Sequence, residues 1–312
     1  MTAHPCADQV KVGHSVAAEL PGPSGVGGIR FLDGKNGWAF GPELWATHNG
    51  GESWTQIPTG GLRVTDLETA GSRAYALFAQ CEGTSASGFA AACTSYTLMS
   101  AAADSDKWTP VGGATNGLTA QGAATSGMIA LWGTTGYLAA PDGTLYSGMA
   151  GSAWQRAGTL PCQPGNVQLS GLPGTAALAL SSATTLATAC HGDTADAPPK
   201  VYTSSDSGAT WALVTAAWTG PVGPASPGSL AATSSGTLLL AAGNGIYFLP
   251  KGAARWQAAS VTGRGAPPGG GFSYIGMTTS EQGVALSTNV ALSEIWMTTD
   301  GGQTWRARPI KG

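Results

Sequence analysis

Three features of this 312-residue sequence predict an all-β protein built as a β-propeller of four-stranded antiparallel blades. A tryptophan recurs about every 50 residues along the chain. Each recurrence follows a second aromatic residue that lies eight to twelve positions upstream. The segments between them are short, β-rich runs bounded by glycine and proline. A period near 50 residues is typical of propeller blades, whereas helical repeats are shorter.

The recurring tryptophans divide the chain into six units. The intervals between them are 54, 46, 57, 45 and 49 residues. The tryptophans are Trp54, Trp108, Trp154, Trp211, Trp256 and Trp305, and their upstream aromatic partners are Trp45, Tyr96, Tyr146, Tyr202, Tyr247 and Trp296. This count favours six blades and leaves seven open.

The first unit shows four strands in order, as GIRFLD, GWAF, LWATH and SWTQIP, each separated from the next by turn residues. The fifth and sixth units repeat this order, and capping boxes are missing from the Ala- and Thr-rich runs that might suggest helices. We therefore expect one propeller domain over residues 28–312. Residues 1–27 form an N-terminal segment, in which residues 8–20 could supply a strand that closes the last blade.

Composition excludes several classes of function. The net charge is -3, only 10% of the residues are charged, and no basic run offers a surface for nucleic acid or an anionic membrane. No apolar stretch reaches the roughly 20 residues that a membrane-spanning helix requires. The 42% hydrophobic content argues against disorder. We expect a monomer that binds no nucleic acid, inserts into no membrane, and uses no cofactor or metal.

Five cysteines indicate the compartment, and none belongs to a C-x-x-C pair. Cys81 and Cys93 lie near the two ends of a long connection in the second unit. Cys162 and Cys190 lie on connections expected at the same face of the propeller. We expect disulfides Cys81–Cys93 and Cys162–Cys190, with Cys6 unpaired. Such disulfides predict a protein that is secreted or exposed at the cell envelope, although the N-terminus shows no signal-peptide pattern.

Three units share the pattern S/T-x-D/N-x-G-x-S/T-W between their third and fourth strands: THNGGESW, SSDSGATW and TTDGGQTW. This pattern resembles the Asp-box, or BNR, repeat of sialidase-like β-propellers. We expect a structural role, because the Asx side chain accepts hydrogen bonds from its own turn, the glycine adopts a positive φ, and the tryptophan packs beside the hairpin. The residues expected to play this role are Asn49, Gly51, Trp54, Asp206, Gly208, Trp211, Asp300, Gly302 and Trp305.

The resemblance covers nearly the whole chain from Gly28. The phrase FLDGKNGWAFG makes it closest to the photosystem II assembly and stability factor-like group of BNR-repeat proteins, which usually have seven blades. Sialidases with this repeat use a Tyr nucleophile supported by carboxylates, and the family adds three arginines and an R-I-P motif. The nearest counterpart here, Arg30-Phe31-Leu32, departs from that motif. The resemblance therefore implies a scaffold more than a sialidase.

Binding residues are expected on the loop face, which carries the connections between strands two and three and between successive blades. Long loops on a rigid scaffold commonly carry binding function. The candidates are Arg63, Glu82, His191, Asp193, Trp218 and Arg264. Trp218 is expected to be exposed and able to stack on a ligand. His191 with Asp193 lacks a further ligand at metal spacing, which favours a polar loop over a metal site.

Asp66, Glu68 and His191 are the catalytic candidates. Asp66 and Glu68 lie two positions apart on one strand and therefore on the same side of it. They could line the central channel and act as a carboxylate pair on a polysaccharide. Solvated carboxylates without a catalytic role are the favoured interpretation. The sequence thus predicts a non-catalytic propeller whose loop face binds a protein or glycan partner, with a polysaccharide hydrolase or lyase as the alternative.

Overall fold

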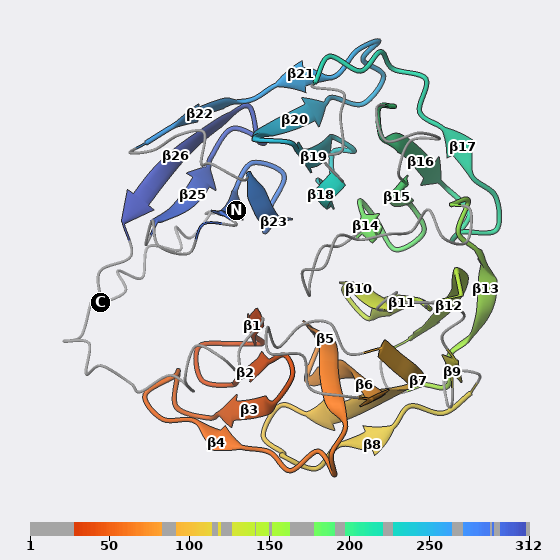
Figure 1. The fold of residues 1–312 in the computed structure, drawn as a ribbon, viewed down its shortest axis with the longest axis vertical. Helices are drawn as coiled ribbons and strands as arrows, with labels where there is room; N and C mark the ends of the chain where they lie inside the picture. The colour runs from red at the N-terminus through yellow and green to blue at the C-terminus, as the bar shows by residue number, and fades with distance from the viewer. Residues whose placement is uncertain are drawn as a thin grey trace, which may run out of the picture.

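The computed structural model describes residues 28–82, 92–113, 118–119, 127–140, 142–149, 152–162, 178–190, 197–220, 227–263, 271–287, 289 and 294–309. Within these residues the protein is a six-bladed β-propeller, each blade is a four-stranded antiparallel sheet, and no helix is present (Figure 1). The predicted fold class is therefore confirmed, with six blades.

Each blade takes its four strands from one continuous stretch of chain. Blade 1 contains β1 (Gly28–Phe31), β2 (Gly37–Phe40), β3 (Leu44–Thr47) and β4 (Thr55–Gln56). Blade 2 contains β5 (Arg63–Ala70), β6 (Arg73–Glu82), β7 (Ala92–Ala102) and β8 (Thr109–Pro110), and β9 (Leu118–Thr119) also pairs with β7. Blade 3 contains β10 (Met128–Trp132), β11 (Thr135–Ala139), β12 (Thr144–Met149) and β13 (Gln155–Thr159).

The second half of the ring repeats this arrangement. Blade 4 contains β14 (Leu178–Leu180), β15 (Leu186–Cys190), β16 (Lys200–Ser204) and β17 (Ala212–Leu213). Blade 5 contains β18 (Pro227–Ala232), β19 (Leu238–Ala242), β20 (Gly245–Leu249) and β21 (Gln257–Ala258). Blade 6 contains β23 (Phe272–Met277), β24 (Gly283–Ser287), β25 (Glu294–Thr298) and β26 (Thr304–Pro309), and β22 (Ser260–Thr262) pairs in parallel with β26. The first antiparallel strand of every blade lies innermost (Figure 1).

The hydrophobic core lies between adjacent blades, because side chains alternate between the two faces of each sheet. In blade 2, Leu67 and Ala76 pack with Trp38 of blade 1. Their strand neighbours point the other way, so Leu77 packs with Trp154 of blade 3. Among the repeating tryptophans, Trp154, Trp256 and Trp305 are buried in cores shared by adjacent blades.

Segments that leave one blade cover the outer edge of the next. After blade 2, Gly113 forms a parallel bridge with Trp154 of blade 3. After blade 4, Ala217 forms the same kind of bridge with Arg255 of blade 5. After blade 5, the whole strand β22 pairs with β26. These contacts occupy backbone groups that an exposed edge strand would leave unpaired.

The turns between the third and fourth strands of three blades share one hydrogen-bonding pattern. In blade 6 the Thr304 amide donates to Asp300 Oδ1 at 2.9 Å, and the Gly302 amide donates to Thr298 Oγ1 at 3.0 Å. The same two bonds occur at Asn49 with Ser53 and Thr47 with Gly51, and at Asp206 with Thr210 and Ser204 with Gly208. These side chains therefore satisfy their own turns.

Both expected disulfides are present, Cys81–Cys93 across β6 and β7, and Cys162–Cys190 between blades 3 and 4. Two disulfides are consistent with an oxidising compartment. Among the described residues, no helix is long and apolar enough to cross a membrane. Residues 1–27, including Cys6, lie outside the described residues. Blade 6 forms its four antiparallel strands from residues 272–309.

Removing either disulfide is expected to lower the free energy of unfolding by about 3 kcal/mol, because each cross-link limits the entropy of the unfolded chain. The larger loss is expected for the Cys162→Ala/Cys190→Ala protein, whose bridge spans 28 residues against 12 for Cys81–Cys93. Urea unfolding followed by tryptophan fluorescence measures both. Equal or reversed losses would contradict the loop-length argument.

Candidate functional site

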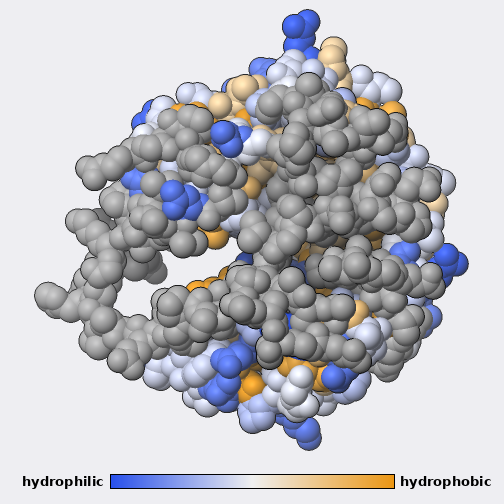
Figure 2. Space-filling view, viewed as in Figure 1, coloured by the Kyte–Doolittle hydropathy of each residue, from blue (hydrophilic) through white to orange (hydrophobic). Residues whose placement is uncertain are grey.

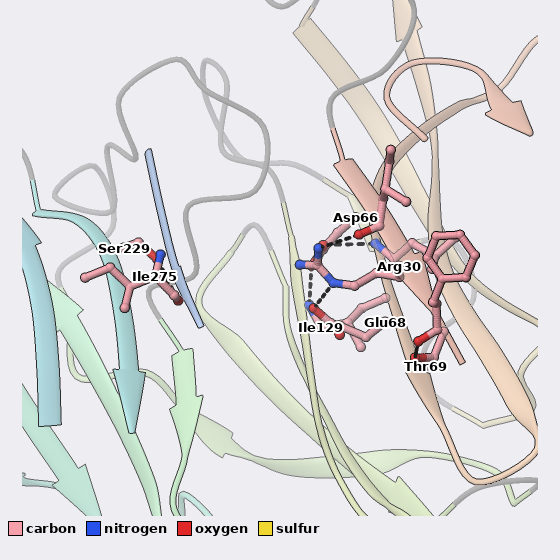
Figure 3. A network of polar contacts seen from close by, with 10 residues as sticks. Arg30, Asp66, Glu68, Thr69, Ile129, Ser229 and Ile275 are labelled. Atoms are coloured by element: carbon pink, nitrogen blue, oxygen red, sulfur yellow. Dashed lines mark hydrogen bonds and ion pairs between the residues drawn. The ribbon is translucent and has the colours of Figure 1, made fainter. Parts of the chain in front are cut away.

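A cavity of about 190 Å³ lies in the central channel, and the inner strands of all six blades line it. Apolar side chains such as Ile129, Leu178 and Leu230 form part of its wall. Its charged residues are Arg30 on β1 together with Asp66 and Glu68 on β5. Figure 3 shows these three side chains converging from adjacent blades. The charged side chains of the cavity wall therefore all come from the inner strands of blades 1 and 2.

Arg30 connects three blades. Its Nε donates a hydrogen bond to Glu68 Oε1 at 2.9 Å, and about a quarter of each side chain remains exposed. The guanidinium carbon lies 5.3 Å from the centre of the Tyr274 ring in blade 6, a cation–π distance. Burial lowers the pKa of Arg30, but the nearby charges of Glu68, Tyr274 and Asp66 and the hydrogen bond to Glu68 together outweigh burial, and the pKa is raised. Arg30 therefore links blade 1 to blade 2 through an ion pair and to blade 6 through a cation–π contact.

Asp66 ties blade 2 to blade 3. Its side chain is buried, and its carboxylate accepts the Ile129 amide at 2.7 Å and the Leu67 amide at 2.9 Å. A register shift between Val64 and Asp66 marks a β-bulge at this point of β5. Burial, and next the charge of Glu68, raises the pKa of Asp66 to about 7, while the two amides oppose this shift.

A similar hydrogen bond between a side chain and the backbone of the next blade occurs on the opposite side of the ring. Ser229 follows a register shift on β18, and the Ile275 amide of blade 6 donates to Ser229 Oγ at 3.0 Å (Figure 3). A serine in blade 5 thus makes the inter-blade contact that Asp66 makes in blade 2. This equivalence indicates that the bond from Asp66 to Ile129 is structural, since a hydroxyl replaces the carboxylate without loss of the contact.

The arrangement of Arg30, Glu68 and Tyr274 favours a structural ion pair over acid–base catalysis. Glu68 is engaged by Arg30, and burial raises its pKa against the opposing charge of that arginine. Burial also raises the pKa of Tyr274, the opposite of what a tyrosine nucleophile requires. Among the residues that the structure describes, no group of three side chains could hold a metal ion.

Asp66 and Glu68 both line the channel, but they are not the solvated pair that the sequence suggested. Asp66 is 7% exposed and points to a backbone amide, so the expectation of a solvated carboxylate was wrong. The partners Arg30 and Tyr274 were not predicted to join them. Arg30 belongs to the first blade and Tyr274 to the last, and only the circular arrangement of the blades brings them together.

A second candidate is an apolar groove of about 500 Å³ on the loop face between blades 1 and 2. Pro42, Ile57, Pro58 and Leu62 line it, with Arg63 at its edge. Its backbone is held by hydrogen bonds, since the Val64 amide donates to the Pro42 carbonyl at 2.9 Å and the Thr59 hydroxyl to the Leu62 carbonyl at 2.6 Å. The groove is thus a shaped surface on the face where binding was expected.

A larger groove of about 790 Å³ lies on the opposite face, between blades 4 and 5. It is lined by the turns between first and second strands and by small side chains, with Leu213 on β17 at its wall. Leu213 is 48% exposed. This groove offers few groups other than hydroxyls and methyls for recognition, apart from Lys251.

The other predicted binding residues do not form a binding surface in the described part of the structure. Trp218 is half-buried, and its ring packs 4.8 Å from Tyr247 and 5.6 Å from Trp256. The expected exposure of Trp218 is therefore corrected, because the segment after blade 4 folds over blade 5 and uses this indole as core. Glu82 ends β6, but its side chain is not described. His191, Asp193 and Arg264 lie outside the described residues.

The fold and the channel together define a six-bladed β-propeller, and several solved structures are similar to it in overall fold. No protein-family model and no curated protein matches the sequence. A solved structure of YCF48 bound to D1 peptide is similar, with 16% identity, a TM-score of 0.57, and 92% of this chain and 83% of that chain covered. YCF48 from Cyanidioschyzon merolae gives 13% identity, a TM-score of 0.56, and coverage of 93% and 87%.

A glycoside hydrolase is equally similar in fold. The GH74 xyloglucanase from Xanthomonas campestris gives a TM-score of 0.59 at 14% identity, over 91% of this chain and 45% of that chain. Identities this low show a shared fold alone. Propellers that bind a peptide and propellers that hydrolyse a polysaccharide therefore both resemble this chain.

Proposed function

We propose that this chain is a non-catalytic, exported binding propeller whose loop-face groove receives a segment of a protein partner. The groove between blades 1 and 2 carries this proposal, because it combines apolar walls with a backbone held by hydrogen bonds. Prolines at two positions, Pro42 and Pro58, reduce the ordering cost of binding. Glu43 and Arg63 give its edge both signs of charge.

Three further observations support a binding role. The channel carboxylates are used inside the protein, Asp66 by backbone amides and Glu68 by Arg30. A propeller of similar fold, YCF48, has a structure with a bound peptide. The two disulfides support export, since such bonds persist in oxidising compartments. A glycan is the second ligand class, because Glu43, Gln56 and Arg63 at the groove offer polar groups that can hydrogen-bond to sugar hydroxyls.

A peptide library displayed on phage, panned against the full chain, tests the proposal. Selected peptides are expected to bind the Pro58→Asp protein about tenfold more weakly, because a carboxylate on the groove wall must be desolvated on binding. The matched control is Leu213→Asp, which places the same charge in the groove of the opposite face. Isothermal titration measures all three proteins.

Two outcomes would overturn the proposal. Peptides that lose affinity only with Leu213→Asp would place binding in the groove between blades 4 and 5. A glycan array that yields ligands sensitive to Pro58→Asp, in the absence of any peptide, would make the partner a glycan.

A hydrolase remains the alternative because the pKa of Asp66 is raised to about 7 beside a second carboxylate, Glu68. A carboxyl group whose pKa lies near neutrality can act as a general acid or base. A reducing-sugar and unsaturated-product screen over a polysaccharide panel, with Asp66→Ala and His191→Ala proteins, tests it. Turnover that either substitution abolishes would establish an enzyme.

A further inference from the structure

The ring of blades is open between blade 1 and blade 6. Figure 2 shows a hollow there, with patches of hydrophobic surface on parts of its rim. Six large hydrophobic side chains are exposed among the described residues, and four lie on these two blades: Ile29 (38%), Phe31 (44%), Leu286 (40%) and Met297 (42%). Exposed apolar side chains gathered in one place usually mark a contact surface.

The exposed side chains of blade 6 belong to a face that the other blades bury. Ala285 and Trp296 are buried in the core against blade 5. Leu286 and Met297 directly follow them on β24 and β25, so they point to the opposite face of the sheet. At the other interfaces of the described ring this face packs on a neighbouring blade, but here it does not.

Blade 1 shows the complementary pattern. Trp38 and Phe40 are buried in the core against blade 2. Ile29 pairs with Ala39, which alternates with them, so Ile29 points away from blade 2. Phe31 lies on the same side of β1 as Ile29, two positions further on. The face of blade 1 that points toward blade 6 therefore carries the exposed side chains Ile29 and Phe31.

The turn of blade 1 confirms that its usual neighbour is missing. A Cβ at Gly302 in blade 6 would meet Leu239 of blade 5, across the blade interface. A Cβ at the equivalent Gly51 of blade 1 has its nearest neighbours in Phe31 and Trp54 of its own blade, at 3.7 and 3.8 Å. The blade 1 turn thus lacks the inter-blade contact that the blade 6 turn makes.

We propose that residues 1–27 of this chain pack in the opening between blades 1 and 6 and close the ring. This segment leads directly into β1, at the edge of the opening. Twenty-seven residues exceed what one strand of this propeller needs, since the strands of blade 1 have four residues or fewer. A tethered segment also has a high effective concentration at this site.

The chemistry of the segment fits the opening. In residues 8–13 (DQVKVG), Val10 and Val12 alternate with polar residues, which gives an extended strand one apolar side. On the blade 6 face, Arg306 is the register partner of the exposed Met297. Asp8, next to the valines in sequence, supplies an opposite charge. The inference is independent of the ligand proposed for the loop-face groove.

Thiol labelling in the full chain tests the proposal. In a Cys6→Ser background, Met297→Cys reports on the opening, and Met149→Cys on β12, where the native side chain is 60% exposed, is the matched control. We expect a maleimide to modify Met297→Cys about tenfold more slowly than Met149→Cys, because the segment covers it. Adding Val10→Asp and Val12→Asp is expected to equalise the two rates, while Gln9→Asp and Lys11→Asp leave the difference in place.

Equal labelling of the two cysteines with the native N-terminal segment would overturn the proposal. So would protection of Met297→Cys that disappears on dilution, since the occupant would then be a second copy of the chain. Where the valine variants fail to fold, a Cys6→Ser, Val12→Cys, Met297→Cys protein gives an independent result. It is expected to form an intramolecular disulfide on mild oxidation, detectable by peptide mass mapping, and a product that is only intermolecular contradicts the proposal.

Discussion

The free energy of unfolding is expected to fall as the pH rises from about 4 to about 7, because of Asp66. Burial raises its pKa in the folded protein from 3.8 to about 7. In this window the folded state binds the proton more tightly than the unfolded state. The stabilising protonation is fully present below pH 4 and is lost as the pH passes the folded pKa. One such group gives a slope of up to about 1.4 kcal/mol per pH unit.

Urea unfolding at several pH values, for the native and the Asp66→Asn proteins, measures this effect. The asparagine stays neutral and keeps an oxygen for the Ile129 amide, so most of the pH dependence should disappear. Asp206→Asn is the matched control, because hydrogen bonds from Thr210 hold the pKa of Asp206 near 2, outside the window. Parallel stability curves for the native and Asp66→Asn proteins would show that Asp66 does not titrate in this range.

Gly302→Ala is expected to cost about 3 kcal/mol of stability. Gly302 has a φ of +90°, which costs an L-residue about 1–2 kcal/mol. Its new Cβ would also collide with Leu239 Cδ2 of blade 5, and overpacking adds about 1–3 kcal/mol. Thermal and urea unfolding measure the loss.

Gly252→Ala separates these two causes. Gly252 has a φ of +79°, but a Cβ there would meet nothing within 4 Å. We expect only the backbone cost of about 1–2 kcal/mol at this position. Equal losses at Gly302 and Gly252 would show that the contact between the turn and the neighbouring blade contributes nothing.

The channel cluster shows why the function of this chain was harder to predict than its fold. The spacing of Asp66 and Glu68 predicts that the two carboxylates share a side of one strand. It does not predict that a β-bulge before Asp66 turns its carboxylate to the Ile129 amide. Nor does it predict that Arg30 neutralises Glu68 while lying over the Tyr274 ring.

Trp218 illustrates the same difference. Its place outside the tryptophan repeat suggested an exposed indole available for a ligand. The structure packs it on Tyr247 and Trp256, because the segment after blade 4 covers the edge of blade 5. The sequence predicted only that binding residues lie on the loop face. The position of the groove between blades 1 and 2 depends on backbone hydrogen bonds that no local sequence pattern predicts.

The sequence alone determined the four-stranded unit, its sixfold repetition, the turns that join third to fourth strands, and both disulfides. Each of these depends on residues close in the chain or on a period that repeats along it. Tertiary structure alone decided which charges meet in the channel and which blade faces remain open. These depend on the circular arrangement of the blades, which brings Arg30 of β1 to 5.3 Å from the Tyr274 ring of β23 although more than 240 residues separate the two strands.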